Sequence, residues 1–220
     1  MQRRPNIVFV VTDEERWKLP RPDGFSLPAH ERIAERGVTF DNYYAASTMC
    51  SSSRSVIYTG RHVPITQVFD NDNMPYVRPL DPALGTIGSM LRDVGYHCAY
   101  KGKWHLANLY TDPANPRSTV DALEPYGFGE WNDWGDIDGG AWAGLKVDPV
   151  IAGAAAQWLR DRAPVVARDQ PWFLAVNFVN PHDIMSFDYD TRSDITMPAG
   201  LDHAVKVKAP ADIPLYQRRW

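Results

Sequence analysis

The chain has 220 residues and a mass of 24.9 kDa, which is long enough for one substantial hydrophobic core and allows one domain or two. It is 44% hydrophobic and 23% charged, as is usual for a globular protein, and its net charge of −4 argues against a broad nucleic-acid surface but allows a small cationic pocket. Two cysteines, Cys50 and Cys98, are too few for a disulfide framework, so we expect two free thiols, with a single bridge as the alternative.

The first predicted element is a strand at residues 6–12. This almost continuous β-branched run is typical of a strand buried on both faces of a parallel sheet. Its apolar part, Ile7–Val11, is too short for a signal-peptide core or a membrane span. The sequence therefore predicts a cytoplasmic protein without a membrane partner.

Two helices and a second strand are expected next. A short helix should cover Pro28–Arg36 and end at Gly37, and residues 38–43 favour a half-buried strand. A further helix is expected from about Ser53 to Tyr58, before the turn at Thr59-Gly60.

The clearest helix signal begins at Asp81-Pro82. Apolar residues at helical spacing continue to the stop at Gly95, and residues 96–101 follow as a strand. Residues 123–144 have no clear period and predict a long ordered loop.

The last predicted helix and strand complete the alternation. Asp148-Pro149 should open the helix, and Trp172–Val179 should form a strand that Asn180-Pro181 ends. Strands that alternate with helices predict an α/β fold, a doubly wound and mostly parallel sheet flanked by helices.

Charged residues follow three of these strands, namely Asp13, the segment Lys101–His105, and His182. Ligands in such sheets bind at the carboxyl ends of the strands, so we expect a functional site there. Asp13 and Glu14 are paired carboxylates that suit a hard cation such as calcium or magnesium. The alternative is a helix cap or a solvated turn.

Cys50 is expected where a helix begins, so that backbone N–H groups and the helix dipole can stabilise an anion beside it. Arg54, four residues later, lies on the same helix face and can reach back toward position 50. The alternative is a buried structural cysteine.

Lys103 and His105 should point to the same side if the extended conformation of the preceding strand continues. A cation beside a proton donor suits an anionic ester. His182 could bind an anion or be oriented by Asp183. The alternatives are a surface lysine and structural histidines.

Together these segments resemble the type I sulfatases of the alkaline phosphatase superfamily. In that family a first strand ends in metal-binding acids, a Cys-x-Pro-Ser-Arg motif begins a helix, and Gly-Lys-Trp-His-Leu and Pro-His segments follow. The order and approximate spacing match over nearly the whole chain, in Asp13-Glu14, Cys50–Arg54, Thr59-Gly60, Gly102–Leu106 and Pro181-His182.

The resemblance implies a sulfuric ester hydrolase that acts on a small anionic ester. Asp13 and Glu14 would bind calcium, or Mg²⁺ or Mn²⁺ in its place, together with residue 50. Cys50 would be oxidised to formylglycine by a formylglycine-generating enzyme; the hydrated aldehyde would attack sulfur, and its second hydroxyl would expel sulfate.

The resemblance also implies roles for the cations and histidines. Arg54 would hold the hydrate, Lys103 and His182 would bind sulfate oxygens, and His105 would assist at position 50 or at the leaving group.

Three features of the sequence depart from the family pattern. They oppose catalytic turnover or change the packing of a side chain. Ser52 replaces the motif's proline, which opposes conversion of Cys50, and Cys98 replaces a threonine. Family members are considerably longer, so residues 1–220 would be the N-terminal part of a catalytic domain whose further metal ligands lie outside them. Asp188, Asp190 and Asp194 have no matching pattern.

Two other functions remain open from the sequence. One is a phosphonate or phosphate monoester hydrolase on the same fold, and the other is an inactive sulfatase-like fragment or binding module. Trp131, Trp134 and Trp142 would suit a sugar-stacking wall, although packing is the more ordinary role. The substrate and the oligomeric state cannot be read from the sequence.

Overall fold

The computed structural model describes residues 4–17, 23–109, 119–137 and 143–183. The chain divides into two compact units, of which the first comprises Met1–Glu15 and Ala46–Ser186 and contains the sheet. The second comprises Arg16–Ala45 and Phe187–Trp220 and contains helix α1 (Pro28–Ala34). Within the described residues no helix is long and apolar enough to cross a membrane.

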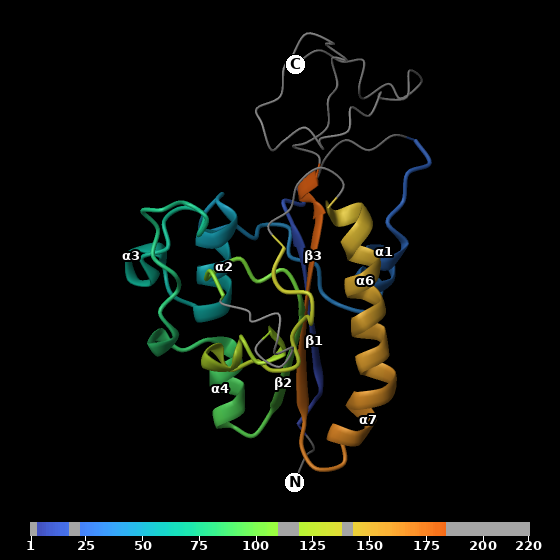
Figure 1. Ribbon diagram of the computed structural model, residues 1–220. Helices are drawn as coiled ribbons and strands as arrows, with labels where there is room; N and C mark the ends of the chain where they lie inside the picture. The colour runs from blue at the N-terminus through green and yellow to red at the C-terminus, as the bar shows by residue number, and fades with distance from the viewer. Residues whose placement is uncertain (1–3, 18–22, 110–118, 138–142, 184–220) are drawn as a thin grey trace. The chain divides into compact units, whose positions relative to one another are not determined.

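The sheet of the first unit has three parallel strands (Figure 1). They are β1 (Ile7–Asp13), β2 (His97–Gly102) and β3 (Trp172–Pro181), in the order β1-β3-β2. Because the three strands are parallel, all of them end at one edge of the sheet, where polar residues from distant parts of the chain meet.

The central strand is apolar on both faces, as a doubly wound sheet requires. Phe173 and Ala175 belong to one hydrophobic core, with Tyr58 and Tyr100, and the intervening residues of β3 belong to a second core. This alternation, with helices on both faces, confirms the predicted α/β fold with a parallel sheet.

Helices α2 and α4 lie on one side of the sheet, and α6 and α7 lie on the other (Figure 1). Two short 3₁₀ turns and a π-helical turn complete the described elements of the first unit. The bounds are α2 (Cys50–Thr59), α3 (Val63–Thr66), η1 (Pro82–Leu84), α4 (Ile87–Asp93), η2 (Glu124–Tyr126), α6 (Ala143–Gln157), η3 (Trp158–Arg162) and α7 (Ala163–Val166).

Strand β1 is not buried on both faces, so that expectation was wrong. Ile7 and Phe9 pack against the first core, but Val8 and Val10 are 47% and 52% exposed. The apolar run predicted the strand correctly, and its exposed face reflects its position at the end of the strand order.

Two other predicted elements differ from the structure. Residues 38–43 form no strand. The helix expected from Asp81-Pro82 is divided into two elements, η1 and α4, and Gly85 is the C-cap of η1. Thr86 then caps α4 by accepting hydrogen bonds from the backbone N–H groups of Gly88 and Ser89.

Pro149 lies inside α6 and does not begin it. The preceding Asp148 has another function, because its carboxylate accepts hydrogen bonds from the backbone N–H groups of Val179 and Asn180, at 2.7 and 2.9 Å. A residue expected to cap a helix therefore ties α6 to the carboxyl end of β3.

Candidate active site

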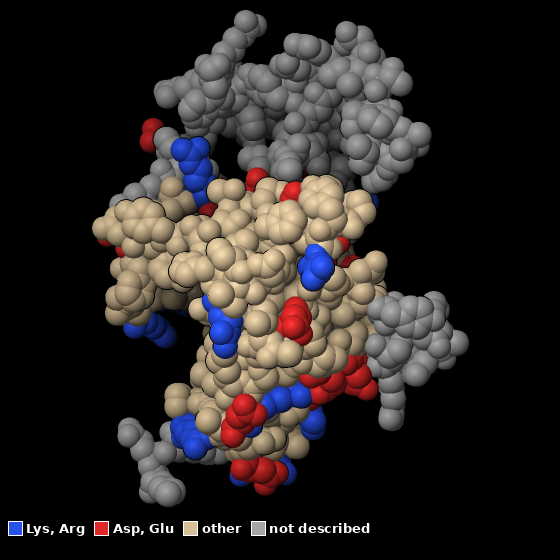
Figure 2. Space-filling model, turned by 90° about the vertical axis from the view of Figure 1, so that its left-hand side faces the viewer, with Lys and Arg blue, Asp and Glu red and all other residues tan. Residues whose placement is uncertain are grey.

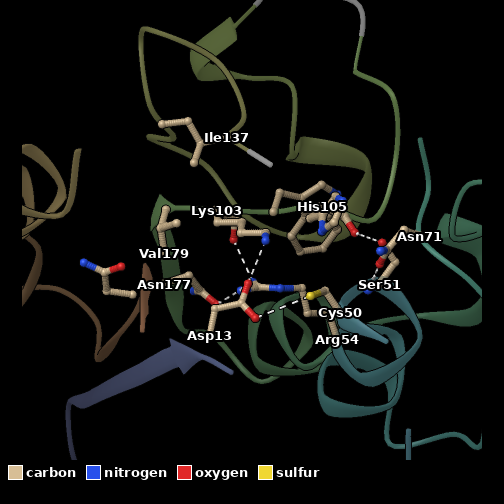
Figure 3. Close-up of polar contacts among 12 residues, drawn as sticks. Asp13, Cys50, Ser51, Arg54, Asn71, Lys103, His105, Ile137, Asn177 and Val179 are labelled. Atoms are coloured by element: carbon tan, nitrogen blue, oxygen red, sulfur yellow. Dashed lines mark hydrogen bonds and ion pairs between the residues drawn. The ribbon is translucent and has the colours of Figure 1, made fainter. Parts of the chain in front are cut away.

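Asp13, the last residue of β1, lies between two buried cations (Figure 3). Its Oδ2 atom is 2.7 Å from Nζ of Lys103 and 3.1 Å from Nη2 of Arg54. Burial raises the pKa of the Asp13 carboxyl, but the charges of Arg54 and Lys103 outweigh it, so the pKa lies below its ordinary value. The three groups form a buried cluster with two positive charges and one negative charge.

Arg54 joins three segments of the first unit. Besides the Asp13 carboxylate, Nη1 donates to the backbone oxygen of Lys103 at 2.9 Å and to Oδ1 of Asn177 at 3.2 Å. Because α2, the end of β2 and the central strand all meet at this guanidinium, its position is fixed by the fold.

Asn177 is a polar residue in the apolar run of β3 and is completely buried. Its Oδ1 accepts a second hydrogen bond, from the hydroxyl of Tyr58 at 2.8 Å. Tyr100 continues this network by donating to the backbone oxygen of Lys103 at 2.7 Å. Asn177 was not predicted as a site residue, although a polar side chain that interrupts a buried strand was an available signal.

Gly102 allows the end of β2 to approach β3 closely. Its φ is +96°, and a Cβ atom there would lie 1.9 Å from the backbone oxygen of Asn177. Lys103 follows directly, and its backbone N–H donates to that same oxygen at 3.1 Å. The strand therefore ends at Gly102, and the expected extended continuation to His105 does not occur.

Cys50 is the first residue of α2, as predicted, and its side chain is part-buried. Sγ lies 3.5 Å from Oδ1 of Asp13, and Figure 3 shows the thiol beside the cluster of Asp13, Arg54 and Lys103. Burial and the charge of Asp13 raise the pKa of the Cys50 thiol. The thiol is accordingly in its protonated form at neutral pH.

His105 is buried, and Figure 3 shows it near Ser51 and Asn71, at the start of α2. Its Nε2 atom lies 3.1 Å from Oδ1 of Asp72, and its backbone oxygen accepts a hydrogen bond from Ser51 Oγ at 2.7 Å. Burial and the nearby charges of Lys103 and Arg54 lower the pKa of His105 to about 3. The ring is therefore neutral at pH 7.

Two other predicted site residues, Glu14 and His182, are not members of the buried cluster of Asp13, Arg54 and Lys103. Glu14 is exposed and has a φ of 65°, so its side chain does not join the buried carboxylate of Asp13. His182 Nδ1 and Asp183 Oδ1 are both buried without a hydrogen-bond partner among the described residues. Asp183 instead accepts from the backbone N–H of Gly144 through Oδ2, so the expected orientation of His182 by Asp183 is not made through these atoms.

The described residues supply only part of a calcium site. Calcium takes about six to eight oxygen ligands, whereas no group of three or more His, Cys, Asp or Glu side chains in the described ranges could hold a metal ion. Asp13 offers a buried carboxylate, but both oxygens already contact protein groups. The described residues alone therefore supply too few oxygen ligands to complete the site.

The other residues considered from the sequence have ordinary positions. Trp131 is packed in the first core and donates through Nε1 to the backbone oxygen of Gly102, and Trp134 is 40% exposed. Cys98 is a buried free thiol. Trp142 and the three acids at positions 188, 190 and 194 lie outside the described residues.

The surface over α2, α3 and α4 carries acidic and basic side chains side by side. On the described part of this face, Figure 2 shows no broad area of a single sign.

Comparisons with known proteins identify the family. Residues 5–198 match the sulfatase family. The N-acetylglucosamine-6-O-sulfatase of Bacteroides thetaiotaomicron is 31% identical over 133 residues, which are 59% of this chain but 20% of that protein. The chain thus aligns with about a fifth of that curated relative's length.

Solved structures share the fold at low identity. A candidate sulfatase from Bacteroides thetaiotaomicron has a TM-score of 0.58 and 22% identity, covering 88% of this chain and 40% of its own. A phosphonate monoester hydrolase from Silicibacter pomeroyi has a TM-score of 0.54 and 20% identity, covering 81% of this chain and 42% of its own.

Proposed function

Because the chain belongs to the sulfatase family, we propose that it hydrolyses sulfate monoesters and that residue 50 is its reactive position. The proposal covers the catalytic roles, the cofactors and the substrate class. The chain would supply the N-terminal part of the catalytic domain, as its share of its relatives' length suggests.

The observation that supports this function best is the buried cation pair beside Cys50. Lys103 is completely buried and Arg54 is 3% exposed, and the Asp13 carboxylate contacts both. Two cations in a poorly solvated site favour binding of an anionic group. A sulfate ester at the start of α2 would also face the backbone N–H groups of that helix.

The state of Cys50 favours a modified reactive group. A raised pKa keeps the thiol protonated, which disfavours a thiolate nucleophile. We therefore propose that a formylglycine-generating enzyme converts the Cys50 thiol to an aldehyde, with molecular oxygen as the oxidant and a thiol as the reductant, and that the sulfur of Cys50 leaves as sulfide. The hydrated aldehyde would provide one hydroxyl to attack sulfur and a second to release sulfate.

The remaining residues would bind and orient the substrate. Arg54 would hold the group at position 50, and Lys103 and His182 would contact the sulfate oxygens. His105 would transfer a proton at position 50 or at the leaving group.

Asp13 would be one ligand of a calcium ion, with Mg²⁺ or Mn²⁺ as alternatives. Glu14 and the group at position 50 would be further ligands, and the set would be completed by groups outside the described residues. The ion would stabilise negative charge on the ester oxygens when bound. The mixed surface charge leads us to expect no nucleic-acid partner.

Parallel assays would test the reaction class. The protein should hydrolyse 4-nitrophenyl sulfate in calcium and, as the alternative ion, in manganese, and a chelator should abolish the activity. Phosphate or phosphonate monoester hydrolysis that is faster by orders of magnitude would reject the sulfatase assignment in favour of the phosphoesterase. Lack of both activities would favour a binding module.

Intact mass measurement would test the modification. Conversion of Cys50 to formylglycine lowers the mass by about 18 Da. The variant Ser52→Pro restores the proline of the family motif. The buried Ser52 hydroxyl has no hydrogen-bond partner among the described residues, so this variant should fold. It should also raise the fraction of protein in which Cys50 is converted. Fully reduced Cys50 in both proteins from the native host would exclude the formylglycine mechanism.

A further inference from the structure

The Asp72 carboxylate lies beside His105, the buried histidine of the site. Oδ1 of Asp72 lies 3.1 Å from Nε2 of His105, and the two side chains are only 10% and 4% exposed. A carboxylate beside one ring nitrogen favours the tautomer that carries its proton on that nitrogen. The contact has the distance of an ion pair but not the geometry of a hydrogen bond, so Asp72 acts on the ring through its charge.

The backbone of His105 is held in an uncommon conformation. Its φ is 55°, in the left-handed region that residues other than glycine seldom adopt. The backbone N–H donates to Oδ2 of Asp136 at 2.7 Å, and the backbone oxygen accepts from Ser51 Oγ. These hydrogen bonds hold the backbone of His105 on both sides and so fix the direction in which its imidazole side chain points.

Ser51 also brings Asp72 to that imidazole. Its buried hydroxyl accepts a hydrogen bond from the Asp72 backbone N–H at 3.1 Å, and its own backbone N–H donates to Oδ1 of Asn71 at 3.3 Å. One serine, adjacent to Cys50, thus anchors both Asp72 and His105. Figure 3 shows Ser51 and Asn71 beside His105 at the start of α2.

The cations near His105 indicate what the Asp72 carboxylate contributes. Lys103 and Arg54 both disfavour a positive charge on the ring. A negative group at Nε2 opposes them at short range and lowers the energy of the ring while it holds a proton. A neutral amide at position 72 would keep the shape of the site without this charge.

We propose that Asp72 is a positioning residue whose carboxylate charge, close to Nε2 of His105, favours the tautomer that carries its proton on Nε2 and so sets the ring for proton transfer at residue 50. This inference rests on the proposed function, because it concerns the reaction at that residue. The role is separable from the anchoring of the loop, since the bond to Ser51 uses the backbone of Asp72 and survives a change of side chain.

Nitrogen NMR tests the contact without any turnover. In protein labelled with ¹⁵N-histidine, the His105 signals are identified by their loss in His105→Gln. The native ring should show the Nε2–H tautomer at pH 7, and Asp72→Asn should shift it toward the Nδ1–H form. Asp70→Asn is the matched control, because Asp70 lies in the same loop but accepts from the hydroxyl of Tyr76. Unchanged His105 shifts in Asp72→Asn would overturn the proposal.

A double-mutant cycle tests the consequence for catalysis. Asp72→Asn should lower kcat by about tenfold to hundredfold with little change in KM, and Asp70→Asn should have no such effect. In a His105→Gln background, Asp72→Asn should lower kcat no further. An equal loss of kcat in both backgrounds would mean that Asp72 acts through the loop alone. If native protein has no esterase activity, the proposed function fails and the NMR result still decides the contact.

Discussion

Asp13 is the residue whose charge the folded state most clearly requires. Its carboxylate is the anion that Arg54 and Lys103 share, and all three side chains are nearly or fully buried. Buried charges are stable only when paired, and removing one partner leaves the others uncompensated. Here a single substitution would leave two cations facing each other.

We therefore expect Asp13→Asn to lower the free energy of unfolding by about 3–5 kcal/mol, measured by urea denaturation at pH 7. Glu14→Gln is the neighbouring control and should change it by less than about 0.5 kcal/mol, because Glu14 is exposed. Equal effects of the two substitutions would show that the buried cluster does not contribute to stability.

Among the elements, β2 and η3 are joined through Glu130. Its carboxylate accepts from Nε2 of His97 at 2.8 Å, from Nε1 of Trp158 at 2.6 Å and from Nε of Arg162 at 3.1 Å. Burial raises the pKa of Glu130, but the hydrogen bonds from these three side chains outweigh it and lower the pKa to about 2. The ionised form is therefore the one that links these elements.

The sign of the pH dependence follows from this lowered pKa. Glu130 binds a proton more weakly in the folded than in the unfolded protein, so its contribution is complete above the unfolded pKa of about 4.3 and declines toward pH 2. Unfolding free energies of native protein and Glu130→Gln should differ most at pH 7 and converge near pH 2. A difference that stays constant from pH 7 to pH 3 would contradict the prediction.

The junction of β2 with β3 depends on Gly102. Any side chain there would meet the backbone oxygen of Asn177, in a conformation with positive φ. Gly102→Ala should lower the free energy of unfolding by at least about 2 kcal/mol, seen as a lower urea midpoint.

Gly153 provides the control for that substitution. It lies in α6 with nothing within 4 Å of an added Cβ, so Gly153→Ala should leave stability unchanged or raise it by up to about 1 kcal/mol. A similar loss for both glycines would indicate a general sensitivity to alanine and not a local clash.

At the scale of the whole molecule, the sequence predicted the elements whose signals are local. The apolar runs of β1 and β3, the start of α2 near Cys50 and the parallel α/β class were all correct, because hydrophobic period and turn residues determine them. The exposed face of β1 was not predicted, since burial on the second face depends on strand order.

The site was predictable as a set of residue types and less so as a geometry. Asp13 and Lys103 meet at the strand ends, as the strand-end rule indicated, and Arg54 and Cys50 join them from α2. The contact of Asp72 with His105 depends on Ser51 and on a left-handed backbone, and neither has a spacing that can be read from the sequence.

The position of Asn177 has a consequence for engineering this protein. An algorithm that optimises stability would replace this buried amide with valine or isoleucine, because Nδ2 has no hydrogen-bond partner among the described residues and the strand around it is apolar. The substitution would remove the acceptor shared by Arg54 and Tyr58. Because both of these donors are buried, the loss of their shared acceptor would cost free energy of unfolding, so the substitution would lower the stability that the design seeks to raise.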